Sequence, residues 1–167
     1  MNALDAFLLV WSRARDTFGS GEPTDGTAFD RSAEFRAVED AIRAAGPGSA
    51  WSGTAAAGYE TANGAYAGAL SRLAELDRQL RTEVDRSAGI VLTGRDELDA
   101  VRDQVVELAA TIPDTADGDY ALWSLLSQGS AAVGDILQRS HAELAAISLR
   151  IKEISRSWAA LHASQSS

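Results

Sequence analysis

The chain contains no cysteine among its 167 residues. Disulfide bonds and cysteine-based zinc sites are therefore excluded, and the redox compartment cannot be inferred. Basic side chains are also scarce, since 15 Lys and Arg stand against 24 Asp and Glu, for a formal net charge of −9. Nucleic acids and anionic membrane surfaces would repel such a chain, so we expect neither as a partner.

Long hydrophobic runs are missing as well. No stretch approaches the roughly 20 apolar residues of a membrane-spanning helix. The apolar patch at residues 6–11 follows Asp5 and precedes Arg13 and Arg15, whereas a secretory signal peptide carries its positive charge before a longer apolar run. We therefore expect no membrane span and, if the protein is exported, a route that does not use a signal peptide.

Patterns typical of catalytic or metal sites are absent too. His141 and His162 are the only histidines, and because a metal site needs convergent ligands, they are better interpreted as surface residues. Carboxylates alternate with arginines over residues 72–107. That alternation is typical of a solvated, salt-bridged helix surface, not of the pocket that a general acid–base pair needs. We expect no enzyme activity, no cofactor and no metal ion.

Helical periodicity is what the sequence does contain. Its three prolines, Pro23, Pro47 and Pro113, lie near glycines or aspartates and divide the chain into four segments with helical character. We predict an all-α fold in a single domain spanning residues 1–167. Residues 1–50 would hold two short helices, followed by one long helix over 54–112, continuous or interrupted, and another over 119–163.

The two long segments carry matching hydrophobic seams. In the first, steps of four and three residues connect Leu80, Val84, Ser87, Val91, Gly94, Leu98, Val101, Val105, Leu108 and Ile112. The same spacing recurs from Leu122 to Leu161, after an acidic turn at residues 113–118. We expect the two segments to form a long antiparallel helical hairpin within an elongated bundle of about four helices.

Two surfaces could receive another helix. Residues 55–69 are rich in alanine and glycine, which admit close backbone approach. The first segment, residues 2–18, carries Phe7, Leu8 and Trp11, more apolar surface than one neighbour would cover. Either could bind a partner helix or mediate self-association.

The tripeptide Trp51-Ser52-Gly53 stands between the second and third segments. Gly53 can take a positive φ, and Trp51 can cover the end of a helical bundle. On the tripeptide alone, an incidental loop tryptophan is the preferred interpretation. The wider pattern changes this, because Ala55-Ala56, Tyr59 and the string L-A-E-L-D-R-Q-L over residues 73–80 follow. Together these residues resemble the N-terminal domain of the EspA/EspE family of mycobacterial ESX (type VII) secretion substrates, within the W-x-G superfamily.

The resemblance implies a secretion substrate or secretion-associated protein that acts through helical protein–protein interaction. Such a protein would be cytoplasmic before export and then secreted or held at the cell surface. Trp51, Gly53 and Tyr59 become the candidate residues for secretion or partner recognition.

The Y-x-x-x-D/E pattern of many type VII substrates is absent. The residues four positions after the tyrosines are Asn63, Leu70 and Ser124. The resemblance therefore implies a helical partner that carries the export signal, with a secretion chaperone or ATPase as further candidates. Two alternatives stay open, a cytoplasmic helical scaffold or adaptor and the delivery domain of a larger secreted toxin.

Overall fold

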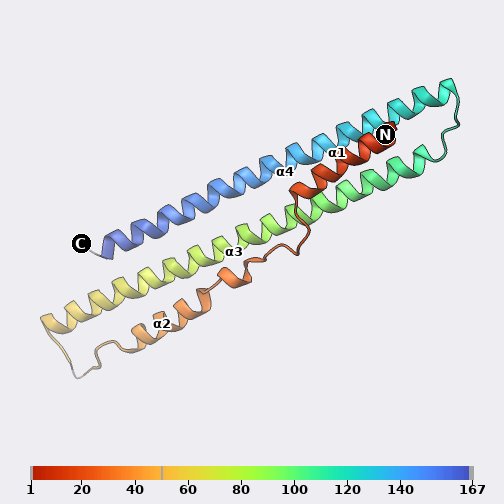
Figure 1. Ribbon diagram of the computed structural model, residues 1–167. Helices are drawn as coiled ribbons and strands as arrows, with labels where there is room; N and C mark the ends of the chain where they lie inside the picture. The colour runs from red at the N-terminus through yellow and green to blue at the C-terminus, as the bar shows by residue number, and fades with distance from the viewer. Residues whose placement is uncertain (1, 50, 166–167) are drawn as a thin grey trace. The chain divides into compact units, whose positions relative to one another are not determined.

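The computed structural model describes residues 2–49 and 51–165, and within them the protein contains helices and no strands (Figure 1). The predicted all-α fold class is confirmed. The elements are α1 (Ala3–Thr17), a short 3-10 helix η1 (Gly26–Phe29), α2 (Ser32–Ala44), α3 (Thr54–Ala109) and α4 (Ala116–Gln165). None of the helices in the described part of the chain is long and apolar enough to cross a membrane.

Local capping interactions fix where the helices begin. At α1, the Asn2 side chain accepts a hydrogen bond from the Asp5 amide at 2.8 Å, and the Asp5 carboxylate accepts one from the Asn2 amide at 2.9 Å. This reciprocal pair satisfies two amides that have no partner within the helix. At α4, the Thr115 hydroxyl accepts from the Gly118 amide at 3.1 Å, so the acidic turn after Pro113 leads directly into the helix.

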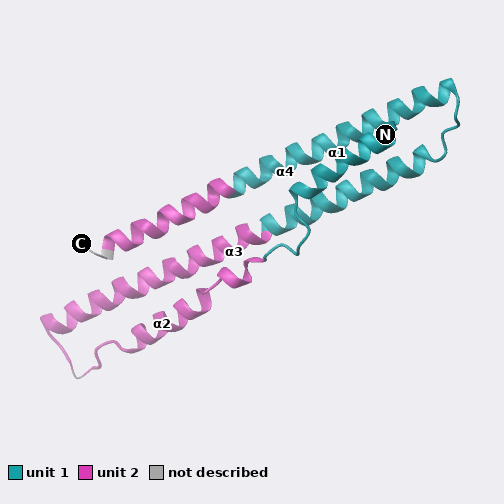
Figure 2. Cartoon of the chain, in the orientation of Figure 1, with its two compact units in different colours: residues 1–24, 86–147 teal, residues 25–85, 148–167 magenta. Residues whose placement is uncertain are grey.

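The chain groups into two compact units (Figure 2). Unit 1 comprises residues 1–24 and 86–147, and unit 2 comprises residues 25–85 and 148–167. Both long helices contribute to both units, because α3 and α4 each continue through a unit boundary. The single domain stays a prediction.

Unit 1 has a core formed by three helices. Phe7, Ala14 and Phe18 come from α1 and its C-terminal cap, and they cluster with buried residues of α3 and α4, which are Leu98, Val105, Leu126, Val133 and Ile136. Within this unit α3 and α4 pair antiparallel, since Val105 lies beside Gly129 and Glu97 forms an ion pair with Arg139 farther from the turn.

Of the two surfaces that could receive a partner helix, α1 does not keep Phe7, Leu8 and Trp11 free for one. Phe7 is only 3% exposed, and Leu8 and Trp11 pack against the unit 1 core. The reason is that α1 lies on both long helices at once, so its apolar face has two neighbours. The exposed apolar side chains of α1 are Leu9 and Val10 instead.

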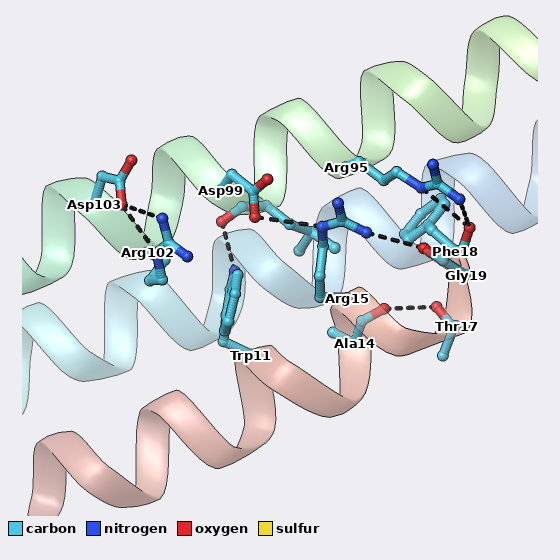
Figure 3. Close-up of polar contacts among 11 residues, drawn as sticks. Trp11, Ala14, Arg15, Thr17, Phe18, Gly19, Arg95, Asp99, Arg102 and Asp103 are labelled. Carbon is cyan, nitrogen blue, oxygen red and sulfur yellow. Dashed lines mark hydrogen bonds and ion pairs between the residues drawn. The ribbon is translucent and has the colours of Figure 1, made fainter. Parts of the chain in front are cut away.

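Polar contacts also hold α1 to α3 in unit 1 (Figure 3). The Trp11 indole Nε1 donates to the Leu98 carbonyl at 2.7 Å, and Arg15 pairs with Asp99 at 3.3 Å. Arg95 donates to the Phe18 carbonyl at 2.6 Å and to the Gly21 carbonyl at 2.7 Å. The end of α1 and the loop that follows it are thereby fixed to α3.

Unit 2 holds η1 and the start of α2 against α3 through charged side chains. The Asp85 carboxylate accepts from the Gly26 amide at 2.7 Å, and the Asp77 carboxylate accepts from the Arg31 amide at 3.1 Å. Arg81, between these two aspartates on α3, pairs with Asp30 at 3.0 Å. The backbone approaches so closely here that a Cβ at Gly26 would lie 2.2 Å from the Arg81 carbonyl oxygen.

The unit 2 segment of α4 packs on α3 through small and β-branched side chains. Ala67, Ala74 and Ile154 are buried, and Arg150 donates to the Glu83 carboxylate at 2.8 Å. Alanines allow the two helices to approach closely, but they contribute little volume to a core.

One residue of the predicted seam is exposed. Leu108 is 42% exposed, because α3 ends one residue later at Ala109. On α2, Val38 is 49% exposed, whereas Phe35 and Ile42 are half-buried.

Candidate protein-recognition site

The turn that leads into α3 is defined by backbone contacts. The Trp51 amide donates to the Gly48 carbonyl at 3.0 Å, which folds the chain back after Pro47. Gly53 has φ of 107°, a conformation that glycine adopts without the strain a Cβ would cause. Its carbonyl accepts the Ala57 amide at 3.1 Å, so Gly53 both reverses the chain and begins the hydrogen-bond ladder of α3.

This turn brings Trp51 against Tyr59. The ring centroids are 5.6 Å apart and the ring planes are tilted by 54°, a geometry that stabilises aromatic pairs by about 0.5–1.5 kcal/mol beyond their buried area. Trp51 is nevertheless 51% exposed and Tyr59 39% exposed. The structure thus places Trp51, Gly53 and Tyr59 together in unit 2, with much of the aromatic surface facing solvent.

A shallow cavity of about 510 Å³ lies beyond this pair, between α3 and α4 of unit 2. Its lining includes Gly64, Tyr66, Gly68, Arg72, Leu161 and Ser164. A second cavity, of about 430 Å³, continues past Arg72 and Leu161 toward Leu76 and Ser157. We call the two together the α3–α4 groove.

The chain's own side chains do not fill the space over the small residues of α3. A Cβ built at Gly58, Gly64 or Gly68 would meet no atom within 4 Å. Alanine would stabilise an exposed helix position by roughly 1 kcal/mol relative to glycine. The open space shows that close packing within the chain does not require these glycines.

On its other side, Gly64 borders a cavity of about 320 Å³ next to the end of α2, lined also by Ile42, Pro47 and Asn63. The Asn63 amide nitrogen Nδ2 is buried and has no hydrogen-bond partner. A buried polar group without a partner costs about 1–3 kcal/mol.

The charged cluster that holds η1 and α2 serves packing. Hydrogen bonds from Ser32, followed by Arg81, lower the pKa of Asp30 to about 2. Asp77 is 2% exposed, and burial raises its pKa against the opposing hydrogen bond from the Arg31 amide. Within the described residues, no group of three or more His, Asp or Glu side chains is arranged to hold a metal ion.

Sequence reasoning missed this cluster and the α3–α4 groove. A signal for the cluster was present, because Asp77, Arg81 and Asp85 recur every four residues along one face of α3. The only sequence pattern that points to the groove is the run of alanine and glycine over residues 55–69. That run does not show which helix lies opposite.

Comparisons with known proteins cover about half of the chain, and the family match includes Trp51, Gly53 and Tyr59 but not the α4 side of the groove. Residues 18–100 match the model of the EspA/EspE family. Over 89 residues the chain is 36% identical to the ESX-1 secretion-associated protein EspA of Mycobacterium tuberculosis, in strain CDC 1551 / Oshkosh and equally in strain ATCC 25618 / H37Rv.

The aligned stretch is 52% of this chain but 22% of the relative. The chain thus spans about a fifth of the length of these curated relatives. No solved structure matches it.

Proposed function

Because this chain carries an EspA/EspE-like domain over residues 18–100, we propose that it is an ESX secretion-associated protein. It is exported in complex with a helical partner and acts by presenting helical surfaces. The export signal resides on the partner, and no signal peptide is used.

The observation that carries this proposal is the half-exposed pair of Trp51 and Tyr59. An aromatic residue kept only for packing would be expected to bury most of its area. Here the turn at Gly53 presents both rings to solvent inside the stretch that matches the family. Trp51, Gly53 and Tyr59 form the recognition surface in this proposal.

The α3–α4 groove is the docking site for the partner in the same proposal. Small residues on both sides of it favour close backbone approach of a helix. The missing acidic residue four positions after each tyrosine supports a partner that supplies the export signal.

Export itself is the first test. Immunoblots of culture filtrate from the native host should detect the protein, and deletion of the ESX secretion ATPase should abolish the signal while the cell-associated pool remains. A protein found only in the cytosol of both strains would favour a scaffold and refute the proposal. Export from a strain that lacks every candidate partner gene would refute the dependence on a partner.

A Trp51→Ala variant separates recognition from folding. Because Trp51 is half exposed, we expect the melting temperature to stay within a few degrees, since about 1 kcal/mol shifts a domain of this size by roughly 2–4 °C. Export should fall sharply. Unchanged export together with a collapse in stability would make Trp51 a packing residue only.

A Gly64→Leu variant tests the groove. It should weaken co-purification with the partner from the native host, because the new side chain enters the docking space. Gly89→Leu is the matched control, since a Cβ at exposed Gly89 of unit 1 also meets no atom within 4 Å. Equal co-purification of both variants with the partner would show that the groove is not used.

A further inference from the structure

Two large aromatic side chains are exposed on the first turns of α4. Tyr120 is 79% exposed and Trp123 is 66% exposed. They are three residues apart and therefore share one helix face. Leu126 and Val133 belong to the unit 1 core and Leu122 packs against it, whereas neither Tyr120 nor Trp123 is among the residues of that core. The two aromatic rings consequently contribute little to that core.

The helix around these rings carries no charge. From Tyr120 to Gly134 the sequence has no Asp, Glu, Lys, Arg or His, although the chain as a whole is 23% charged. Other exposed residues along this face of the helix include Ser124, Ser127 and Ala131, and we call these three residues with Tyr120 and Trp123 the aromatic face of α4. Depletion of charge together with enrichment in Tyr and Trp distinguishes the centre of a protein interface from ordinary surface.

Acidic residues border the aromatic face. Three of them, Asp114, Asp117 and Asp119, lie in the turn before α4 and in its first turn. Over residues 103–138 the sequence has six Asp and Glu and no Lys, Arg or His. This negative charge favours a positively charged partner, because interfaces pair surfaces of opposite potential. Bringing like charges together costs free energy. A second copy of this chain would bring two acidic rims together.

We infer that the aromatic face of α4 binds a basic amphipathic helix of another protein. Apolar side chains of that helix cover Tyr120 and Trp123, while its flanking Arg or Lys side chains reach the carboxylates of Asp117 and Asp119. A cation over the Trp123 or Tyr120 ring adds about 0.5–2 kcal/mol. The uncharged stretch is roughly 22 Å long at 1.5 Å per residue, enough for about four turns of a partner helix.

This surface lies outside residues 18–100 and belongs to unit 1, whereas Trp51 and Tyr59 belong to unit 2. The inference does not rest on the proposed function. Loss of binding at the aromatic face and loss of export through Trp51 can be measured separately.

The test is calorimetric titration of the full chain with a designed amphipathic peptide that has leucines on one face and arginines on its flanks. A peptide with glutamate at every arginine position is the control. Only the arginine peptide should bind, with an affinity that falls as salt rises. The Y120A/W123A double variant should bind it at least tenfold more weakly, and D117N/D119N should weaken binding and flatten its salt dependence.

Leu149→Ala is the matched control variant, because Leu149 is 62% exposed and belongs to unit 2. It should bind the arginine peptide as the wild type does, and circular dichroism should show equal helicity in all variants. Equal binding of both peptides, or an unchanged affinity in Y120A/W123A, would overturn the inference. Wild-type binding to phosphatidylcholine vesicles that is lost in Y120A/W123A would also overturn it, by making the face a membrane contact.

Discussion

At Gly94 a single added methyl group would disturb the unit 1 core. A Cβ there would lie 2.5 Å from Cε1 and 2.6 Å from Cζ of Phe18, a ring that is 8% exposed. Gly89 lies on the same helix with no atom within 4 Å of a Cβ. Both alanine substitutions gain the same helix propensity, so the difference between them reports overpacking alone.

We predict that Gly94→Ala is less stable than Gly89→Ala by about 1–3 kcal/mol in urea unfolding. Gly89→Ala should exceed the wild type by up to about 1 kcal/mol. If the two variants gained equal stability, Phe18 would have room to move and the close contact would carry no cost.

Asp77 and Asp30 should have opposite effects on the pH dependence of stability. The raised pKa of Asp77, caused first by burial, means that the folded state binds its proton more tightly than the unfolded state. The contribution of Asp77 to the free energy of unfolding therefore falls as pH rises above the ordinary aspartate pKa of about 3.9. The neighbouring Asp30 and Glu34 reinforce the shift, and the Arg31 amide and side chain oppose it.

We predict that Asp77→Asn gains stability relative to the wild type as pH rises from about 4 to 7. Asp30, with its pKa lowered to about 2, should behave in the opposite way. The wild type should exceed Asp30→Asn above pH 4 and lose that advantage as pH falls toward 2. Urea unfolding at several pH values measures the stability of the wild type and of both variants. If the free energies of unfolding of the wild type and Asp77→Asn changed in parallel with pH, the raised pKa of Asp77 would be contradicted.

The sequence predicted some buried residues and not others, for a physical reason. Leu98, Leu126 and Val133 are buried where steps of three and four residues placed them, because a helix that packs along its length repeats its contacts. Asp77 could not be predicted as buried, since its partner is a backbone amide 46 residues away. Periodicity carries no information on such a contact.

At the scale of elements, Arg95 holds α1 in place. Its guanidinium donates to the Phe18 and Gly21 carbonyls, just after α1 ends. The sequence had suggested a residue on a solvated charged face, but Arg95 is half-buried. Charge-assisted hydrogen bonds contribute about 1.5–3 kcal/mol each when well formed.

We predict that Arg95→Ala lowers the stability of the protein by about 1–3 kcal/mol and speeds amide hydrogen exchange in α1 more than in η1 or α2. Arg95→Lys should restore part of the protection, because an ammonium can reach one of the carbonyls. Equal exchange rates in α1 of wild type and Arg95→Ala would show that the apolar contacts of Phe7 and Phe18 hold α1 unaided.

The long helices were predictable as elements, whereas the position of α1 was not. Pro113 and the glycines near Pro47 mark where α3 and α4 can begin and end. The face of α1 that is buried depends on both long helices together. Trp51, Gly53 and Tyr59 were grouped by resemblance, and the structure adds the contact between the two rings.

At the scale of the whole molecule, each unit combines segments that are far apart in sequence. Residues 148–165 of α4 supply unit 2 with Ile154 and with Arg150, the partner of Glu83. Unit 1 has its own core, to which these residues do not contribute.

We predict that a chain ending at Ile147 loses hydrogen-exchange protection over residues 54–85 and keeps it in α1 and over 86–109. Ile154→Ala in the full chain is the milder counterpart, expected to cost about 2–5 kcal/mol with faster exchange confined to unit 2. Loss of protection throughout the shortened chain would mean that the two units unfold as one.

The Trp11–Leu98 hydrogen bond joins residues 87 positions apart, which sets a time scale for folding during synthesis. A ribosome adding roughly 5–20 residues per second needs about 4–17 s to reach Leu98 after Trp11. During that interval the α1 segment has an apolar face and no core to join. Unit 2 can form only later, once the residues from 148 onward have been synthesised. A factor that binds nascent chains therefore has several seconds in which Phe7 and Trp11 are accessible, although the finished protein buries them.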